Sequence, residues 1–357
     1  MHPFCSIIIP VRNDAEKLRW CLRSIGELDY PREQMEIIVV DGGSTDESRM
    51  VAASFGARVI DNPGKWCGPA RNIGFAFSRG DIIAFCDADC TVDPLWLLHG
   101  IAALDNPRIG GVGGPIRVPQ QEQRIAEAIR YFYRLAVACA GIGHAEKVRA
   151  PHACRCIPTC NLLCRREVLE QVFPFCWGLA CGSDLELSRL IRAQGYTLIV
   201  LPDIIVWHAK KTSVHAFICQ MYGYGEGRMH LLRRDSSTFE WMHVLGGCTL
   251  PLAVFFLMFA RGSSASLVLL GVIGTCMAIY TTWVAIQARS LHVAVLSPIM
   301  TFTGLIMWSA GFLGEVFIPH PLPPQLRGKV RRVSGAGGYL QKSVQASEDC
   351  TAMAPGP

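Results

Sequence analysis

The first half of the chain alternates short apolar runs with stretches in which apolar residues recur at helical spacing. After the opening run, Leu18, Cys21, Leu22 and Ile25 fall on one face of a helix. Four apolar runs predict strands at residues 4–10, 36–40, 58–60 and 82–86. Further helices are predicted at residues 44–56, 68–79 and 93–104, the first opened by a Ser44–Glu47 capping box and the last by Asp93. This alternation predicts an α/β fold, with a mostly parallel sheet covered by helices on both faces.

Acidic side chains follow two of the predicted strands. Asp41 comes directly after the second strand, and Asp87 and Asp89 come directly after the fourth. Ligands of parallel α/β sheets bind at the carboxyl ends of the strands, so these carboxylates mark a candidate site. No Gly-x-Gly-x-x-Gly motif follows the first strand, which argues against a dinucleotide-dependent dehydrogenase.

The second half of the chain is far more apolar than the first. Half of the 357 residues are hydrophobic and only 18% are charged, and the long uncharged stretches all follow Glu240. A helix needs about 20 apolar residues to cross a bilayer. The sequence therefore predicts a soluble domain at residues 1–235, a membrane region at 236–320 with segments at 243–260, 264–287 and 293–316, and a basic, disordered tail at 321–357.

The charges leave the number of membrane crossings open. The first apolar run is too short for a signal peptide, so we expect an integral protein of the cell (inner) membrane whose soluble domain is cytoplasmic. Basic residues lie both before the first segment and after the last, and basic flanks prefer the cytoplasm. Three full crossings would separate those flanks. One segment is therefore expected to be re-entrant or interfacial, and Pro298 makes the third a candidate.

The cysteines and the net charge exclude several classes of protein. Sixteen cysteines in a cytoplasmic domain and membrane segments predict reduced, buried thiols rather than a disulfide framework. The run of cysteines at 154, 156, 160 and 164 lacks the paired spacing of zinc ribbons, so it does not predict structural zinc. A net charge of +5 without interleaved basic and aromatic residues predicts no nucleic-acid partner. Basic residues near the membrane are expected to meet anionic lipid or phosphate.

Four motifs follow one another on consecutive strand–helix units. They are Ser-Ile-Ile-Ile-Pro-Val-Arg-Asn at residues 6–13, Val-Val-Asp-Gly-Gly-Ser-Thr-Asp at 39–46, Gly-Pro-Ala-Arg-Asn at 68–72 and Phe-Cys-Asp-Ala-Asp at 85–89. Together they resemble the family 2 glycosyltransferases, whose catalytic domain has the Rossmann-like GT-A fold. The resemblance covers residues 4–230, and with its membrane tail the chain is similar to the succinoglycan-type glucosyltransferases of exopolysaccharide synthesis.

The resemblance implies a nucleotide-sugar donor and the residues that bind it. Cleavage of the donor develops negative charge on the leaving diphosphate, which a cation must neutralise. Asp89 would hold Mg²⁺ or Mn²⁺, and Asp87 would reach the ribose hydroxyls or the same ion. Asp41 would contact the base, although forming the turn before Gly42 is an equally natural role. The other implied donor contacts are Pro10 and Asn13 beside the base and Arg71 and Arg228 at the phosphates.

Three features near these residues leave a question open or have a simpler reading. Asp14 stands where the family often has Glu, which leaves the contact of that position in doubt. Arg71 could instead be an exposed arginine on a helix. The thiols of Cys86 and Cys90 flank the acidic pair, and a site for a hard metal does not require them, so they are expected to be packing residues.

The resemblance also implies a general base. Residues 182–195 look like the family's Glu-Asp motif at the start of a helix, with Asp184 in the position of the base. Ser183 departs from the usual Glu, and Ser183 with Glu186 instead forms a predicted capping box. The helix N-terminus would favour the ionised form of Asp184. Glu186 is the second candidate base, and a purely structural role for Asp184 stays open.

Further residues are assigned to the acceptor side by the same resemblance. Asn161 matches an Asn near the acceptor, although structural capping could explain it, and Gly114 matches a turn beside the acceptor pocket. His208 and Gln220 belong to segments that resemble the C-terminal signature of membrane members of the family. An interfacial helix carrying Gln220 and Arg228 would close over the donor diphosphate.

These expectations combine into one predicted function with rivals. The predicted protein is an inverting glycosyltransferase that moves a hexose from a nucleotide diphosphate sugar, most simply a UDP-sugar, to a lipid-linked or polysaccharide acceptor at the cytoplasmic membrane face. A related alternative uses polyprenyl phosphate as the acceptor. Two rivals from other classes are a non-catalytic membrane scaffold that retains nucleotide binding and a zinc-binding interaction protein.

Overall fold

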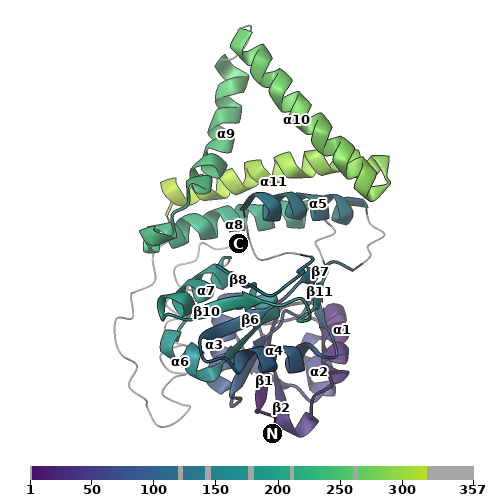
Figure 1. Cartoon of the computed structure of the whole chain (residues 1–357), viewed down its shortest axis with the longest axis vertical. Helices are drawn as coiled ribbons and strands as arrows, with labels where there is room; N and C mark the ends of the chain where they lie inside the picture. Colours follow the sequence, from purple (N-terminus) through teal and green to yellow (C-terminus); the bar gives the residue numbers. More distant parts are fainter. Residues whose placement is uncertain are drawn as a thin grey trace. The chain divides into compact units, whose positions relative to one another are not determined.

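The computed structural model describes residues 2–119, 124–140, 146–175, 181–209, 213–259 and 264–319. The described chain forms two compact units, labelled by element in Figure 1. The sheet unit comprises residues 2–119 and 146–209, and the helical unit comprises residues 124–140 and 213–319. This division differs from the domain boundary expected at residue 235. Two helices that carry charged residues, Arg124–Ala140 and Val214–Arg234, belong to the same unit as the apolar helices. The predicted tail at 321–357 lies outside the described residues.

The sheet unit is built on a mostly parallel, eight-stranded sheet with the order β3-β2-β1-β4-β9-β6-β10-β8. The first four strands in this order are parallel, and β9 runs antiparallel between β4 and β6. The strands are β1 (Cys5–Val11), β2 (Met35–Asp41), β3 (Arg58–Asp61), β4 (Ile82–Phe85), β6 (Ile109–Gly113), β8 (His152–Cys154), β9 (Leu162–Arg165) and β10 (Thr197–Val200). The α/β fold class and the four predicted strands are confirmed.

Alternating residues of β1 explain the two apolar cores. Ile7 and Ile9 pack with Leu18 in one cluster, while Ile8 between them packs with Ile73 in another. Side chains of a strand point to opposite faces in turn, so a run without polar residues needs cover on both faces. The cover comes from α1 (Ala15–Gly26), α2 (Ser48–Ser54), α3 (Cys67–Phe77), α4 (Trp96–Leu104), α6 (Arg166–Val172) and α7 (Ser183–Ala193), with short 3-10 turns at Arg32–Gln34 and Thr159–Asn161.

Two of these helices begin later than predicted, because side chains bond within the preceding loops. Ser48 Oγ donates to Asp46 Oδ1 at 2.6 Å, so α2 begins at Ser48 and the predicted box of Ser44 and Glu47 does not form. Asp93 Oδ1 accepts from the Leu95 amide at 3.0 Å, and α4 then begins at Trp96.

A second, three-stranded sheet has the order β5-β11-β7, with β5 at Cys90–Val92, β11 at Val206–His208 and β7 at Ile116–Arg117. The antiparallel register of β5 and β11 pairs Cys90 with His208. The amide of Ala209 extends this ladder by donating to the Asp89 carbonyl at 3.2 Å. This small sheet therefore brings the end of β11 beside the acidic pair that follows β4.

The helical unit contains α5 (Arg124–Ala140), α8 (Val214–Arg234), α9 (Trp241–Phe259), α10 (Ser264–Ala288), α11 (Leu291–Phe317) and a 3-10 turn at Ser236–Thr238. In Figure 1, α8, α11 and α5 lie side by side, while α9 and α10 project away from them. Glycines let α8 and α11 approach closely. A Cβ on Gly225 would lie 1.9 Å from the Trp308 carbonyl oxygen, and one on Gly311 would lie 2.0 Å from that of Tyr222.

Two helices in the described part of the chain are long and apolar enough to cross a membrane. They are α10 over Gly271–Ala288 and α11 over Leu291–Phe317. Only 6% of the α10 window is buried, whereas 44% of the α11 window is buried. The predicted segment at 243–260 falls within α9, which contains Pro251 and does not join these two in the described residues.

Candidate active site

The carboxyl end of β2 carries Asp41 beside Val11, the last residue of β1. The buried carboxylate of Asp41 accepts hydrogen bonds from the Ser44 amide at 3.2 Å and from Arg49 at 2.9 Å. Arg49 also pairs with Asp61 at the end of β3, at 2.5 Å. Asp41 therefore has the turn-forming role that the sequence allowed, and its contact with a base stays a prediction.

The other two residues expected beside the base lie at the same edge of the sheet. Pro10 is buried in β1, in register with Val40 of β2. Asn13 follows in an exposed loop, with a positive φ of 51°, and its Oδ1 accepts from the Thr45 amide at 2.7 Å. This bond ties the loop after β1 to the loop after β2, which shapes the edge at which a ligand would bind.

Arg71 joins three segments at the centre of the site. Its side chain is buried, donates to Asp87 Oδ1 at 2.6 Å and donates to Ser183 Oγ at 3.2 Å. The alternative of an exposed helix arginine is therefore wrong. One guanidinium connects α3, the loop after β4 and the first turn of α7. Sequence reasoning did not identify Ser183 as a partner of Arg71, because the two residues are distant in the chain.

The start of α7 departs from the predicted capping box. The N-cap is Gly182, with a φ of 85° and no side-chain cap, and the helix begins at Ser183. Ser183 Oγ accepts from Arg71 instead of capping the helix. Asp184 is consequently the second helical residue rather than the first. Glu186, the second candidate base, is only 1% exposed and so has no opening toward an acceptor.

Burial raises the pKa of the Asp184 carboxyl above its ordinary value of 3.8, and Asp87 nearby adds to this shift. The Leu185 amide, which donates to Asp184 Oδ1 at 3.0 Å, and the charge of Arg71 oppose it. Backbone amides at the start of α7 lower the pKa of Asp184, as expected, but burial outweighs them. A carboxylate with a raised pKa is a stronger base, which suits proton abstraction.

Asp89 lies against His208 on the small sheet. Its Oδ1 is 3.2 Å from His208 Nε2, and both side chains are largely buried. Neighbouring positions around an octahedral ion with bonds of about 2.1 Å are roughly 3.0 Å apart, so this oxygen and nitrogen fit one divalent cation. The sequence predicted Asp89 as a ligand but not His208 beside it, because the pairing of β11 with β5 brings them together.

The expected acceptor residues Asn161 and Gly114 are enclosed by protein. Asn161 Oδ1 accepts from Trp96 Nε1 at 2.8 Å and its Nδ2 donates to the Ile204 carbonyl at 2.9 Å, with the side chain fully buried. A Cβ on Gly114 would lie 2.1 Å from the carbonyl oxygen of Ile204 and 2.7 Å from that of Leu201. Both residues contact the chain that leads into β11, which agrees with the structural role left open for Asn161, and their predicted place near an acceptor stays a prediction.

Gln220 and Arg228 both lie on α8 in the helical unit. Gln220 Oε1 accepts from Tyr133 Oη at 2.9 Å, and Gln220 Nε2 donates to Tyr224 Oη at 3.1 Å. Arg228 is bonded to His243 and lies 3.7 Å from Glu240. Their predicted roles beside an acceptor and a diphosphate stay predictions.

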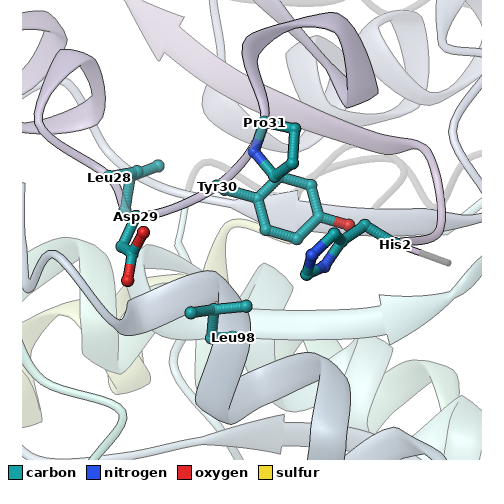
Figure 2. Close-up of a pocket in the computed structure, with 6 residues that line it drawn as sticks. All are labelled: His2, Leu28, Asp29, Tyr30, Pro31 and Leu98. Atoms are coloured by element: carbon teal, nitrogen blue, oxygen red, sulfur yellow. The ribbon is translucent and has the colours of Figure 1, made fainter.

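An open pocket lies at the opposite edge of the sheet. Figure 2 shows its lining side chains, which are His2, Leu28, Asp29, Tyr30, Pro31 and Leu98. His2 precedes β1 and Tyr30 precedes β2, so the pocket faces the amino ends of these strands. The carboxylates of the candidate site follow the carboxyl ends, and this pocket is therefore separate from them.

Comparisons with known proteins bear on the family and the fold of the chain. The family model for glycosyl transferase family 2 matches residues 6–173. The glycosyltransferase AglE of Haloferax volcanii is 31% identical over 239 residues, which cover 65% of this chain and 75% of that one. A Methanococcus voltae enzyme, named a dolichyl N-acetyl-α-D-glucosaminyl phosphate 3-β-D-2,3-diacetamido-2,3-dideoxy-β-D-glucuronosyltransferase, is 23% identical, and the match covers 68% of this chain and 78% of that one.

A solved structure shares the fold. A mannosyltransferase of Pyrobaculum calidifontis, in complex with GDP-Man and Mn²⁺, superposes with a TM-score of 0.61 at 18% identity, over 88% of each chain. Two bacterial relatives are longer proteins, and this chain spans 58% and 56% of their length.

Proposed function

The chain belongs to glycosyl transferase family 2, and from this premise we propose that it is an inverting transferase that moves a hexose from a nucleotide diphosphate sugar to a lipid-linked or saccharide acceptor. A UDP-sugar is the proposed donor. The observation that carries the proposal is the Arg71 bridge, which holds Asp87 and the start of α7 together and brings Asp184 beside them. The guanidinium of Arg71 thus acts on both Asp87, the proposed donor-binding carboxylate, and Asp184, the candidate base.

The donor half of the proposed site lies along the ends of β1, β2 and β4. Asp41 and Asn13, which are bonded to the loop after β2, would border the base, and Asp87, held by Arg71, would reach the ribose. Asp89 and His208 would hold the divalent ion, which would neutralise charge on the leaving diphosphate. The Mn²⁺ bound by the mannosyltransferase of shared fold supports a divalent ion here, as Mg²⁺ or Mn²⁺.

The acceptor half depends on Asp184. Its raised pKa and its place at the start of α7 suit removal of a proton from an acceptor hydroxyl. One base and one displacement invert the configuration of the transferred sugar. The name of the Methanococcus voltae relative includes a dolichyl-linked sugar phosphate, which supports a lipid-linked acceptor for this chain.

The helical unit is proposed to hold the enzyme at the membrane. The exposed face of α10 is apolar and includes Val268, Val272, Ile279 and Ile286. In contrast, α11 lies along α8 and α5, both of which carry Arg and Glu side chains. Charged helices packed along α11 would be costly to place with it in the hydrocarbon core. We therefore propose that α11 is an interfacial helix and that α10 spans the membrane together with α9, whose 19 residues contain most of the apolar segment predicted at 243–260.

Charged and apolar side chains on α11 support this assignment. Glu315 is fully buried and pairs with Arg233 of α8 at 2.5 Å and with His230 at 3.2 Å, which fixes the end of α11 to a charged helix. On its other face Val295 and Phe302 are exposed, as expected for a surface in contact with lipid.

A donor screen on membranes that contain the protein tests the proposed function. Labelled UDP- and GDP-sugars are supplied with Mg²⁺, Mn²⁺ or chelator, and label that extracts with lipid is counted. We expect transfer from a UDP-sugar that needs the metal and is lost on addition of chelator. Absence of label with every donor, from protein that still binds a UDP-sugar, would favour the non-catalytic scaffold instead.

A further inference from the structure

Three side chains that no step of the proposed reaction uses as a group converge beside Asp89. The Sγ atoms of Cys90 and Cys160 and a ring nitrogen of His208 all lie within 4.8 Å of one another. They come from β5, from the 3-10 turn before β9 and from β11, so no local sequence motif contains them. Within the described residues, this is the one such group of three or more metal-binding side chains.

The donors are of the kind that zinc prefers. Zn²⁺ binds thiolate sulfur at about 2.3 Å and imidazole nitrogen at about 2.0–2.1 Å, and in a tetrahedral site such donors are roughly 3.5–3.8 Å apart. The three donor atoms, now up to 4.8 Å apart, would therefore each need to move by about 1 Å or less, through side-chain rotation, to reach these distances. Mg²⁺ and Mn²⁺ prefer oxygen ligands, so two sulfurs select against them.

Asp89 offers the fourth position. Its Oδ1 lies 3.9 Å from Cys90 Sγ and 3.2 Å from His208 Nε2. The other ring nitrogen of His208, Nδ1, is buried and has no hydrogen-bond partner among the described side chains and backbone. The thiols are sealed, at 1% and 4% exposure, but His208 and Asp89 are 21% and 16% exposed and leave a path for an ion.

We propose that Cys90, Cys160 and His208 form a site for a thiophilic divalent cation of the zinc class, with Asp89 as the fourth ligand. An ion at this site takes His208 and Asp89 as ligands. These two side chains are then no longer available to the Mg²⁺ or Mn²⁺ that the proposed reaction uses. Zinc consequently competes with Mg²⁺ or Mn²⁺ and inhibits transfer. This inhibition rests on the proposed function, whereas the binding of the ion does not.

The proposed site is not the zinc ribbon that was considered for the cysteines at residues 154–164. The spacing of those cysteines argued against a ribbon. Cys160 turns toward Cys90 and His208, and Cys164, four residues later, lies fully buried in the other apolar cluster with Ile8. Cys164 therefore supplies a matched control, because it is as buried as Cys160 but packs away from the three donors.

Cobalt spectroscopy tests the binding without any enzyme assay. The full-length protein, reduced and stripped of metal in detergent, is titrated with Co²⁺, which absorbs strongly in the near ultraviolet when thiolates bind it. We expect one ion per chain with this band, and its displacement by Zn²⁺. The Cys90→Ala and Cys160→Ala variants should lose the band, and Zn²⁺ affinity should fall by more than the 10–100-fold that loss of an outer partner costs. Cys164→Ala should keep both.

Two further measurements keep the result decisive. Thermal unfolding verifies that each variant is folded, and His208→Asn, at a partly exposed position, removes the nitrogen donor while both thiols remain. An unchanged cobalt band in the Cys90→Ala/Cys160→Ala double variant, or a wild-type protein without the band, would overturn the proposal. Where transfer is measurable, the Zn²⁺ concentration that halves each variant's own Mn²⁺-supported rate should rise at least about 10-fold in Cys160→Ala, and an unchanged value would contradict competition at this site.

Discussion

Burial raises the pKa of the Asp184 carboxyl, so this residue trades stability for reactivity. A folded-state pKa above the unfolded value means that protonation favours the folded state. The stability linked to this group is therefore complete at a pH below its ordinary 3.8 and is lost as the pH rises through the raised pKa. Asp184→Asn removes the buried charge and keeps an oxygen for the Leu185 amide.

We expect Asp184→Asn to lower kcat by about 10²–10⁴-fold, as loss of a general base does. Its free energy of unfolding should equal or exceed that of the wild type at neutral pH, and the two proteins should converge in acid. Rate assays and thermal unfolding across pH measure both effects. Nearly intact activity in the variant would instead indicate a phosphate acceptor, since a phosphate nucleophile needs no strong base.

Arg71 is the second residue whose charge and geometry can be separated. Its positive charge lowers the pKa of Asp184, and its two nitrogen atoms reach Asp87 and Ser183. Arg71→Met should move the acid limb of the rate profile to higher pH, because the opposing charge is gone. Arg71→Lys keeps the positive charge but loses the two guanidinium nitrogens that bond Asp87 and Ser183. The acid limb of its pH–rate profile should therefore stay close to that of the wild type, while its rate falls. Equal profiles for both variants would rule out an electrostatic role.

Sequence predicted the acidic residues of the site better than their partners. Asp41, Asp87 and Asp89 follow apolar runs, and the carboxyl ends of parallel strands meet at one edge. The contacts of Ser183 with Arg71 and of His208 with Asp89 depend on how distant segments pair. No local pattern encodes such pairing. The raised pKa of Asp184 was likewise hidden, since burial is a property of the folded chain.

At the scale of elements, the four predicted strands lie close to the observed β1 to β4, and the helix starts were predicted less well. A continuous apolar run in the sequence predicts a buried strand, as at β1 and β4. Helix starts depend on which side chain captures which amide. Ser48 donates to Asp46 at the start of α2, and Ser183 accepts from Arg71 at the start of α7. The predicted capping boxes at residues 44–47 and 183–186 therefore do not form. The antiparallel β9 had no signature, because its short run resembles that of a parallel strand.

Gly114 links the large sheet to the small one and gives a prediction at this scale. A Cβ on Gly114 would lie 2.1 Å from the carbonyl oxygen of Ile204 and 2.7 Å from that of Leu201, so the chain that leads into β11 would have to shift. Gly114→Ala should destabilise the protein by about 1–3 kcal/mol, as overpacking does. It should also weaken metal binding, since β11 carries His208.

Gly64→Ala is the control, because the atoms nearest to its Cβ would be side-chain atoms of Asn62 and Pro69, at 3.4 Å. Its stability should change little. Thermal unfolding and metal titration of both variants measure the difference. A Gly114→Ala protein as stable as Gly64→Ala would show that the chain before β11 adapts, and that the small sheet does not depend on this contact.

For the whole molecule, the proposed membrane topology resolves the conflict between the basic flanks. Arg233 and Arg234 end α8, and Arg327 with Lys329 follow the last apolar segment. If α9 and α10 cross and α11 stays at the interface, two crossings return the chain to its starting side. Both basic flanks then lie in the cytoplasm, as the charge rule favours.

Reporter fusions test this topology. A reporter active only in the cytoplasm, fused after residue 357, should be active, and the same reporter inserted between Phe259 and Ser264 should be inactive. An N-terminal fusion is the control for cytoplasmic activity. An inactive C-terminal fusion would mean an odd number of crossings, either three with α11 in the bilayer or one by α10 alone. Because α11 packs along α8, with Glu315 paired to Arg233, three crossings would carry charged helices into the membrane with α11. A single crossing by α10 would then be the less costly arrangement.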